Sequence, residues 1–236
     1  MKNILCLFII TTLVINQACQ PTSLVNSTKG IQSIDTSKEN IPNLDNAIII
    51  NNFYNNSFEE DNAAVNKSPT GWKNCGDLEE VNVDIHNNID TLFDVVQSTN
   101  NGNNYIGLRT SYNDTWGVIS QKLERELQID SSYLFHLEAC RSTRYINKGR
   151  EGEEDLNEES IRIRIWGGDN DCNRKELLAE SDLVKHTNWK TYIIKMKPKE
   201  NHSSIFIDVF FKKEAIFPYN GNILIDKISP IYLLPQ

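Results

Sequence analysis

The sequence predicts an all-β protein: an antiparallel β-sandwich of the jelly-roll, galactose-binding-like type. Short strand-like runs recur from residue 48 onward, rich in β-branched and aromatic residues and alternating between apolar and polar positions. Joints rich in asparagine and glycine, such as residues 100–103, separate these runs, and no long helical period interrupts them. These two observations favour a sandwich of short antiparallel strands.

The expected elements follow one another at short intervals. The first strand begins at Ile48, and Trp72 is expected to seal the edge of the core behind it. Residues 174–181 are expected to form one short helix, and the acidic run 151–159 an exposed loop. Further strands are expected at 92–97, 105–110, 116–123, 133–140, 161–166, 189–197, 205–211, 222–228 and 231–234.

The first 18 residues have the pattern of a signal peptide. Lys2 precedes an apolar run from Ile4 to Ile15, which is too short to span a membrane comfortably, and Ala18–Cys19 follows at cleavage distance. Cys19 would become the acylated amino terminus of a lipoprotein, although Asn16 stands where Leu or Val is usual in such signals.

The polar composition of residues 19–45 is that of a tether, which leaves residues 46–236 for the folded domain. We therefore expect an exported cell-envelope protein, attached to the outer membrane through a lipid anchor.

Charge and cysteine content narrow the classes of partner. The formal charge of −8 argues against a nucleic-acid partner, which would require a basic patch. Cys75, Cys140 and Cys172 remain in the folded part, and this odd number allows one disulfide and one thiol. They lack CxxC spacing, so a structural zinc site is not expected.

Alternation along three strands places polar and aromatic side chains on the face opposite the apolar residues. If these strands share one sheet, that face combines guanidinium and carboxylate groups for sugar hydroxyls with an aromatic plane for a sugar ring. The alternative is that these charges only pair across the strands of a wet face. The candidate ligand-binding residues are Arg109, Glu138, Arg162, Arg164, Trp166 and Asp208.

Other sites and other functions remain open. A binding site at the loop end of the sandwich would instead use Tyr112, Trp116, Tyr145 and Tyr219. A glycoside hydrolase could use Glu138 and Asp208 as its two carboxylates, but neighbouring arginines work against a general acid. A structural or adhesion spacer, or a partner-binding subunit of an envelope complex, is the third possibility.

Catalytic motifs are lacking, and we expect a non-enzymatic protein. No serine lies in a nucleophile elbow, and no phosphate-binding loop occurs. His86, His186 and His202 lie in polar, loop-like sequence and are expected at the surface.

Several motifs carry a resemblance to a known family. They are Ser57–Phe58–Glu59, the Pro69 to Gly76 segment with Gly71–Trp72, Gly102 to Arg109, Trp116 with Gln121–x–Leu123, Ile165 to Gly168, Glu176 to Ser181 and Pro218 to Asp226. Together they resemble a jelly-roll module of bacterial surface lipoproteins, similar to galactose-binding-like carbohydrate-binding modules and found beside outer-membrane-protein-A-like and gliding-associated modules. The resemblance implies non-catalytic binding of carbohydrate.

The resemblance also implies a structural calcium ion where the first strand meets the last. Glu59 and Asp226 would supply carboxylate ligands, and backbone oxygens near Asn56 would complete the shell. Ser57 to Glu59 would then form one half of a clasp between the two ends of the domain. The family often has a cysteine before the strand at Ser132–Tyr133 that this chain lacks, and Cys75–Cys172 is the preferred disulfide pair.

Overall fold

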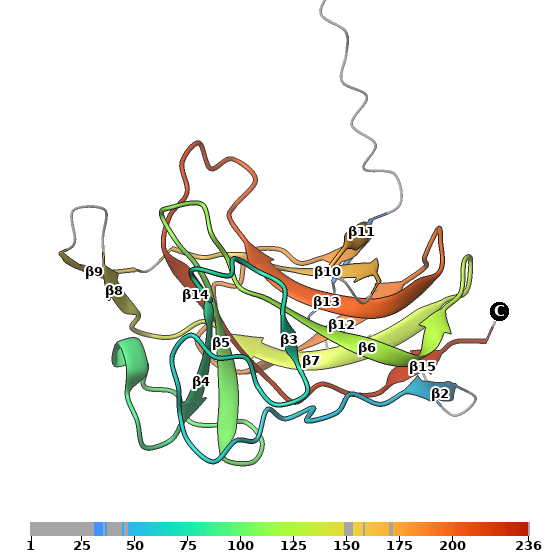
Figure 1. Ribbon diagram of the computed structural model, residues 1–236, viewed down its shortest axis with the longest axis horizontal. Coiled ribbons are helices and arrows are strands. Elements are labelled where there is room, and N and C mark those ends of the chain that lie inside the picture. The colour runs from blue at the N-terminus through green and yellow to red at the C-terminus, as the bar shows by residue number, and fades with distance from the viewer. Residues whose placement is uncertain are drawn as a thin grey trace, which may run out of the picture. The chain divides into compact units, whose positions relative to one another are not determined.

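A computed structural model of the chain describes residues 31–34, 36, 44, 47–148, 153–157, 159–169 and 172–235. The predicted signal peptide, Cys19 and most of the predicted tether lie outside these residues. The described part consists of two large sheets with a hydrophobic core between them (Figure 1), and it contains no α-helix. The predicted all-β jelly-roll sandwich is therefore confirmed.

The first sheet has six strands in the order β1-β11-β10-β13-β6-β3, and we call it the six-stranded sheet. Its neighbours run antiparallel except β1, which pairs with β11 in parallel and comes from the predicted tether. Its strands are β1 (Gln32–Ser33), β3 (Lys73–Asn74), β6 (Val118–Leu127), β10 (Arg162–Gly168), β11 (Arg174–Glu180) and β13 (His202–Phe210).

The second sheet has seven strands in the order β2-β15-β7-β14-β5-β4, with β12 on the other side of β7. We call it the seven-stranded sheet. Its strands are β2 (Ile48–Asn51), β4 (Val83–Asn87), β5 (Asn104–Thr110), β7 (Tyr133–Cys140), β12 (Lys190–Met196), β14 (Gly221–Asp226) and β15 (Ile231–Leu233). A separate two-stranded sheet pairs β8 (Ile146–Lys148) with β9 (Glu154–Leu156), and β9 lies within the acidic run 151–159 that was expected to be a loop.

The alternation in the sequence decides which side chains enter the core. On β10, Ile163 and Ile165 are fully buried between the sheets, and on β13 Ile207 and Val209 are buried beside them. Because successive strand residues point to opposite faces, the residues between them lie on the outer face of the six-stranded sheet. Trp72 is buried in the same core as predicted, with its ring stacked 5.5 Å from that of Phe53.

Two expected elements are wrong. Residues 174–181 were expected to be helical but form β11, because Leu178 and Ala179 are buried when the segment pairs with β10. Residues 92–97 were expected to be a strand but begin with a 3₁₀ helix, η2 (Leu92–Asp94). Pairing with the preceding strand, β10, overrode local preference in the first case.

Two histidine predictions are also wrong. His86 lies on β4 and is 1% exposed, and His202 begins β13 with no exposure. His86 stacks on Tyr105 at 5.3 Å between ring centroids, and burial lowers its pKa to about 4, so the ring is neutral at pH 7.

Within the described residues, no helix has the length and hydrophobicity needed to cross a membrane.

Candidate functional site

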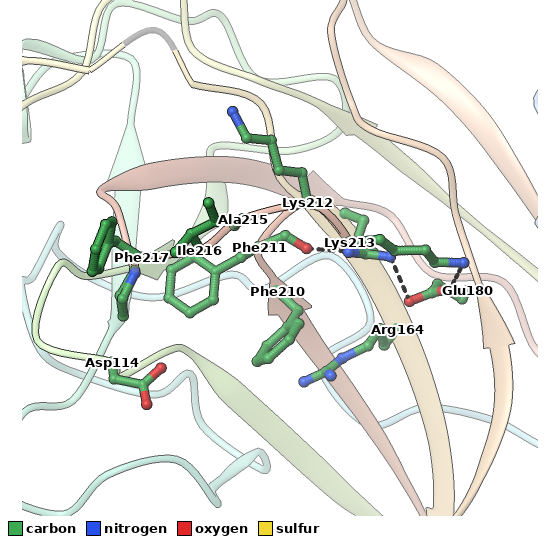
Figure 2. Close-up of a pocket in the computed structure, with 12 residues that line it drawn as sticks. Asp114, Arg164, Glu180, Phe210, Phe211, Lys212, Lys213, Ala215, Ile216 and Phe217 are labelled. Carbon is green, nitrogen blue, oxygen red and sulfur yellow. Dashed lines mark hydrogen bonds and ion pairs between the residues drawn. The ribbon is translucent and has the colours of Figure 1, made fainter. Parts of the chain in front are cut away.

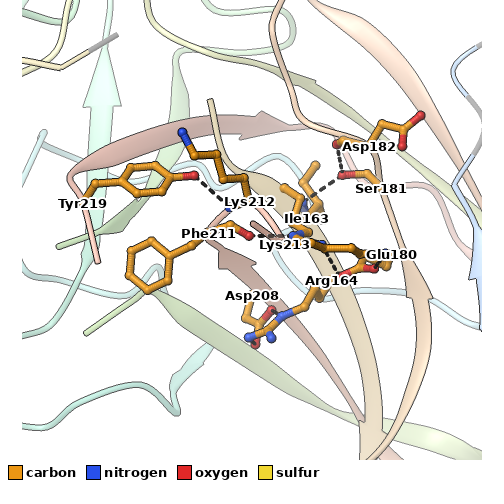
Figure 3. A network of polar contacts seen from close by, with 11 residues as sticks. Ile163, Arg164, Glu180, Ser181, Asp182, Asp208, Phe211, Lys212, Lys213 and Tyr219 are labelled. Carbon is orange, nitrogen blue, oxygen red and sulfur yellow. Dashed lines mark hydrogen bonds and ion pairs between the residues drawn. The ribbon is translucent and has the colours of Figure 1, made fainter. Parts of the chain in front are cut away.

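The outer face of the six-stranded sheet carries a buried carboxylate held by two arginines. Arg164 donates Nε and Nη2 to the two carboxylate oxygens of Asp208, both at 2.8 Å (Figure 3). Arg174 donates Nη1 to Oδ2 of the same group at 2.6 Å, and Trp166 donates its indole Nε1 at 3.1 Å. Pairing of Arg164 with Asp208 across β10 and β13 brings these side chains together.

Asp208 is fully buried, whereas its arginine partners reach the solvent. Burial raises the pKa of the Asp208 carboxyl group, and the charges of Arg164 and Arg174 oppose that rise. The guanidinium of Arg164 also lies 3.7 Å from the ring centroid of Phe210. The carboxylate therefore orients the two guanidinium groups against an aromatic surface, as a preorganised binding group requires.

A pocket of about 460 Å³ opens beside this network, between the sheet face and the loop that follows β13 (Figure 2). The rings of Phe210 and Phe211 lie on one side of it, together with the loop carrying Ile216 and Phe217. Glu180 and Lys213 lie on the other side, and Asp114 lies on the side of Phe217. The lining residues are Asp114, Arg162, Arg164, Glu180, Phe210, Phe211, Lys212, Lys213, Ala215, Ile216, Phe217 and Pro218.

A second ion-pair network holds the charged side of the pocket. Arg162 donates Nη1 to Oε1 of Glu180 at 3.0 Å and Nε to the carbonyl oxygen of Phe211 at 2.6 Å. Lys213 pairs with the other oxygen of Glu180 at 2.7 Å. Arg162 is thus immobilised by β11 and by the start of the loop that borders the pocket.

The structure brings together four of the six predicted ligand residues and separates the other two. Arg162, Arg164, Trp166 and Asp208 share the outer face of the six-stranded sheet. Arg109 and Glu138 lie on β5 and β7 of the other sheet, with the core between the two groups. The predicted single constellation of six residues is therefore wrong, because strand order cannot be read from alternation.

Arg109 is unsuited to bind a ligand in this structure. Its side chain is 5% exposed and pairs with the buried carboxylate of Asp84 at 2.6 Å. It also donates to Oδ1 of Asn66 at 2.6 Å and to the Val81 carbonyl at 3.1 Å. Glu138 accepts a 2.7 Å hydrogen bond from Thr191, its neighbour on β12.

The loop-end aromatic residues are divided in a similar way. Trp116 lies beside the guanidinium groups of Arg164 and Arg174, at 5.8 and 5.9 Å, and packs edge-on against Phe210 at 4.9 Å. Tyr145 is 1% exposed and belongs to a buried cluster on the other sheet. The sequence left a sheet-face site and a loop-end site as alternatives. The pocket is lined by Arg162 and Arg164 of the predicted sheet-face site, and the four loop-end aromatic residues are not among its lining residues.

The hydroxyl of Tyr219 supports the base of the pocket loop. It accepts a hydrogen bond from the backbone amide of Lys212 at 2.8 Å and donates to the carbonyl of Ser160 at 3.0 Å. Tyr112 lies nearby, where its backbone amide donates to the Asn220 side chain at 3.1 Å. Tyr219 therefore acts as a brace for the loop.

Sequence reasoning missed Arg174, Glu180 and the loop from Lys212 to Phe217. Arg174 and Glu180 were hidden because their segment was assigned to a helix. The loop had a readable signal: Ile216 and Phe217 are consecutive apolar residues beside Pro218, and they are 86% and 69% exposed. Exposed apolar pairs next to a polar rim often mark interaction sites.

The predicted calcium ligands lie around one loop, but their oxygen atoms already accept hydrogen bonds. Glu59 accepts from the amide of Asn103 at 3.0 and 3.1 Å, and Asp226 accepts from Asn100 and Asn101 at 3.0 and 2.7 Å. The Asn56 carbonyl accepts from Ile228 at 2.7 Å. A cation would have to displace these donors, so the residues as arranged do not form an oxygen shell, and calcium stays a prediction.

A disulfide connects two segments next to strands of the six-stranded sheet. Cys75, which follows β3, is bonded to Cys172, which precedes β11, over a separation of 97 residues. Cys140 is a buried free thiol. Cys75 also lines a small pocket with Trp116 and Arg174, so the bond lies next to the Asp208 network.

No protein-family model matches this sequence, and no curated protein matches it either. Several solved structures are similar to this chain in fold, at low sequence identity. The chain is similar to the CBM22-1 xylan-binding domain from Paenibacillus barcinonensis (13% identity, TM-score 0.45, 77% of this chain and 93% of that one). It is also similar to a cleaved adhesin domain of Lys-gingipain from Porphyromonas gingivalis (11% identity, TM-score 0.44, 76% and 96%).

The enzymatically active domain of the bacteriophage CBA120 tailspike protein 4 has a similar score, with 12% identity and a TM-score of 0.45. The match covers 78% of this chain and only 22% of the tailspike. Likeness at this level says nothing of what this chain binds.

Proposed function

We propose that this protein binds glycans without catalysis, in the pocket between the outer face of the six-stranded sheet and the loop after β13. One observation carries the proposal: the pocket combines the rings of Phe210 and Phe211 with the oriented side chains of Arg162 and Arg164. A sugar presents apolar C–H surfaces and pairs of hydroxyl groups, and such a pocket offers a partner to each.

The proposal of a non-catalytic role rests on the positions of the carboxylates. Glu138 and Asp208, the pair considered for a hydrolase, lie on the outer faces of different sheets with the core between them. They cannot flank one glycosidic bond. Asp208 is also fully buried and held by Arg164 and Arg174, which leaves it no access to a substrate.

The test is binding of the purified full chain to a glycan array and to immobilised polysaccharides. Phe217→Ala removes a 69% exposed ring from the pocket wall, so we expect about a tenfold loss of affinity with little loss of stability. Tyr54→Ala is the matched control, since Tyr54 is 66% exposed and lies outside the pocket lining. Equal binding by wild type and Phe217→Ala would contradict this location of the site.

We also propose that the protein is exported and anchored to the envelope through acylated Cys19. The support is the sequence alone: a charged start, a short apolar run, and a cysteine after Ala18. Cells labelled with palmitate should incorporate label into the wild-type protein, and Cys19→Ser should abolish it and release the protein from membranes. Equal labelling of both proteins would contradict the anchor.

A further inference from the structure

Two carboxylates in and beside the pocket, Glu180 and Asp208, are largely buried, and three cations in and beside it are more exposed. Asp208 is fully buried, and the side chain of Glu180 is 13% exposed. By contrast, the side chains of Arg174, Lys212 and Lys213 are 26%, 39% and 67% exposed. A ligand entering the pocket therefore meets these cations before the two buried carboxylates, in a chain whose formal charge is −8. Asp114 is the exposed acidic residue of the lining.

Each of the two inner carboxylates is shared by two cations. Asp208 is paired with both Arg164 and Arg174. Two positive charges therefore stand against one negative charge, and one positive charge is left over at this point of the site.

Glu180 is likewise shared by two cations. Its Oε1 pairs with Arg162 and its Oε2 with Lys213. Lys212 is balanced by Glu159 at 3.4 Å, and Asp114 is the remaining acidic residue among those lining the pocket. With Asp114 counted, these groups still carry an excess of positive charge.

We infer that the proposed glycan ligand is anionic, with a carboxylate or sulfate group that lies against the guanidinium groups and Lys213. This inference rests on the proposed function and adds the ligand's chemical class. Guanidinium groups bind oxyanions by donating paired hydrogen bonds to two of their oxygen atoms, and Arg164 and Arg162 are already oriented by their carboxylates. Phe217 and Ile216 would cover the apolar face of the sugar ring that carries the anion.

The experiment compares polymers that share a backbone and differ in charge. Full-length protein is tested against polygalacturonate and its methyl ester, and against dextran sulfate and dextran. We expect at least about tenfold tighter binding to one anionic polymer than to its neutral counterpart. This binding should weaken as the salt concentration rises from about 50 to about 300 mM, because the distance over which charges attract one another shortens with ionic strength. The two pairs separate a carboxylate ligand from a sulfate ligand.

Variants locate the effect in the pocket. Lys213→Gln should weaken binding to the anionic polymer several-fold, and Asp114→Asn should strengthen it. Lys195→Gln is the matched control because Lys195 is an exposed lysine on β12 of the other sheet. Equal losses for Lys213→Gln and Lys195→Gln would mean unspecific attraction to a polyanion and would overturn the assignment to this site.

The two proposals fail in distinguishable ways. Equal affinity for the charged and neutral members of both pairs would overturn the anionic ligand and leave glycan binding standing. Binding to none of the four polymers would also overturn the anionic ligand. If the glycan array were negative as well, glycan binding itself would fail.

Discussion

The two outer faces of the sandwich each hold an arginine–aspartate pair among aromatic rings, and Arg164 of one pair lines the pocket of about 460 Å³. On the seven-stranded sheet, Arg109 pairs with Asp84 at 2.6 Å, with side chains 5% and 0% exposed. On the six-stranded sheet, Arg164 pairs with Asp208, whose side chain is equally buried, but the second partner, Arg174, is 26% exposed. The same chemistry therefore occurs in a closed and an open setting.

The covering segments make the difference. Phe93 of η2 lies under the guanidinium of Arg109 at 4.8 Å, and Tyr145, just before β8, interacts with the same group. The residues around 88–103 and 140–147 thus close the outer face of the seven-stranded sheet. On the other sheet, the loop after β13 stands beside the pair and leaves a pocket. Two similar ion pairs therefore stand in different settings, one in a closed face and one beside the pocket proposed to bind glycans.

The largest effect should come from breaking the closed pair. Asp84→Ala would leave the buried Arg109 charge without its partner, and we expect a loss of about 3–5 kcal/mol in the free energy of unfolding. Asp208→Ala should cost less, about 1–3 kcal/mol, because Arg164 and Arg174 can reach water. Urea unfolding of both variants measures the difference. Equal losses would show that the two faces are not energetically distinct.

Reduction of the Cys75–Cys172 disulfide should have the next largest effect, and it acts on the open face. The bond closes a segment with a separation of 97 residues, so its loss should cost about 2–4 kcal/mol. We expect a lower urea midpoint with reductant and the same midpoint for Cys75→Ser/Cys172→Ser without it. Cys140→Ser is the control for the remaining thiol. An unchanged midpoint on reduction would contradict a stabilising bond.

The smallest expected effect concerns Asp226, a carboxylate on the closed face whose hydrogen bonds come from backbone amides. Burial raises its pKa to about 6, amides of Asn101, Lys227 and Asn100 oppose the rise, and the charge of Glu59 adds to it. The unfolded chain therefore releases this proton at lower pH than the folded protein. Stability should fall as pH rises from about 4 to 6, by about 1–3 kcal/mol.

Urea unfolding across this pH range measures the decline, and Asp226→Asn should flatten it. If calcium binds Glu59 and Asp226, adding the ion should also remove the decline, because the cation stabilises the ionised carboxylate. A melting temperature unchanged by EDTA would count against the calcium prediction.

Much of the candidate site could be predicted from the sequence, but only strand by strand. Alternation in β10 and β13 identified Arg162, Arg164, Trp166 and Asp208 as outer-face residues. The same rule placed Arg109 and Glu138 outside the core correctly, but it gave no means of telling that their strands belong to the other sheet. Burial of His86 was missed because its polar sequence was interpreted as a loop, whereas residues 83–87 form β4 and pair with β5.

The sequence by itself determined the fold class and the face on which each side chain of a strand lies. Both follow from a local rule: neighbouring residues of a strand point in opposite directions, so an apolar face can be read from consecutive residues. Only the tertiary structure decided that β10 lies beside β13 and β11, which brings Asp208 to both Arg164 and Arg174. Strand order depends on contacts between residues far apart in the chain, and local alternation is the same whichever strands are neighbours.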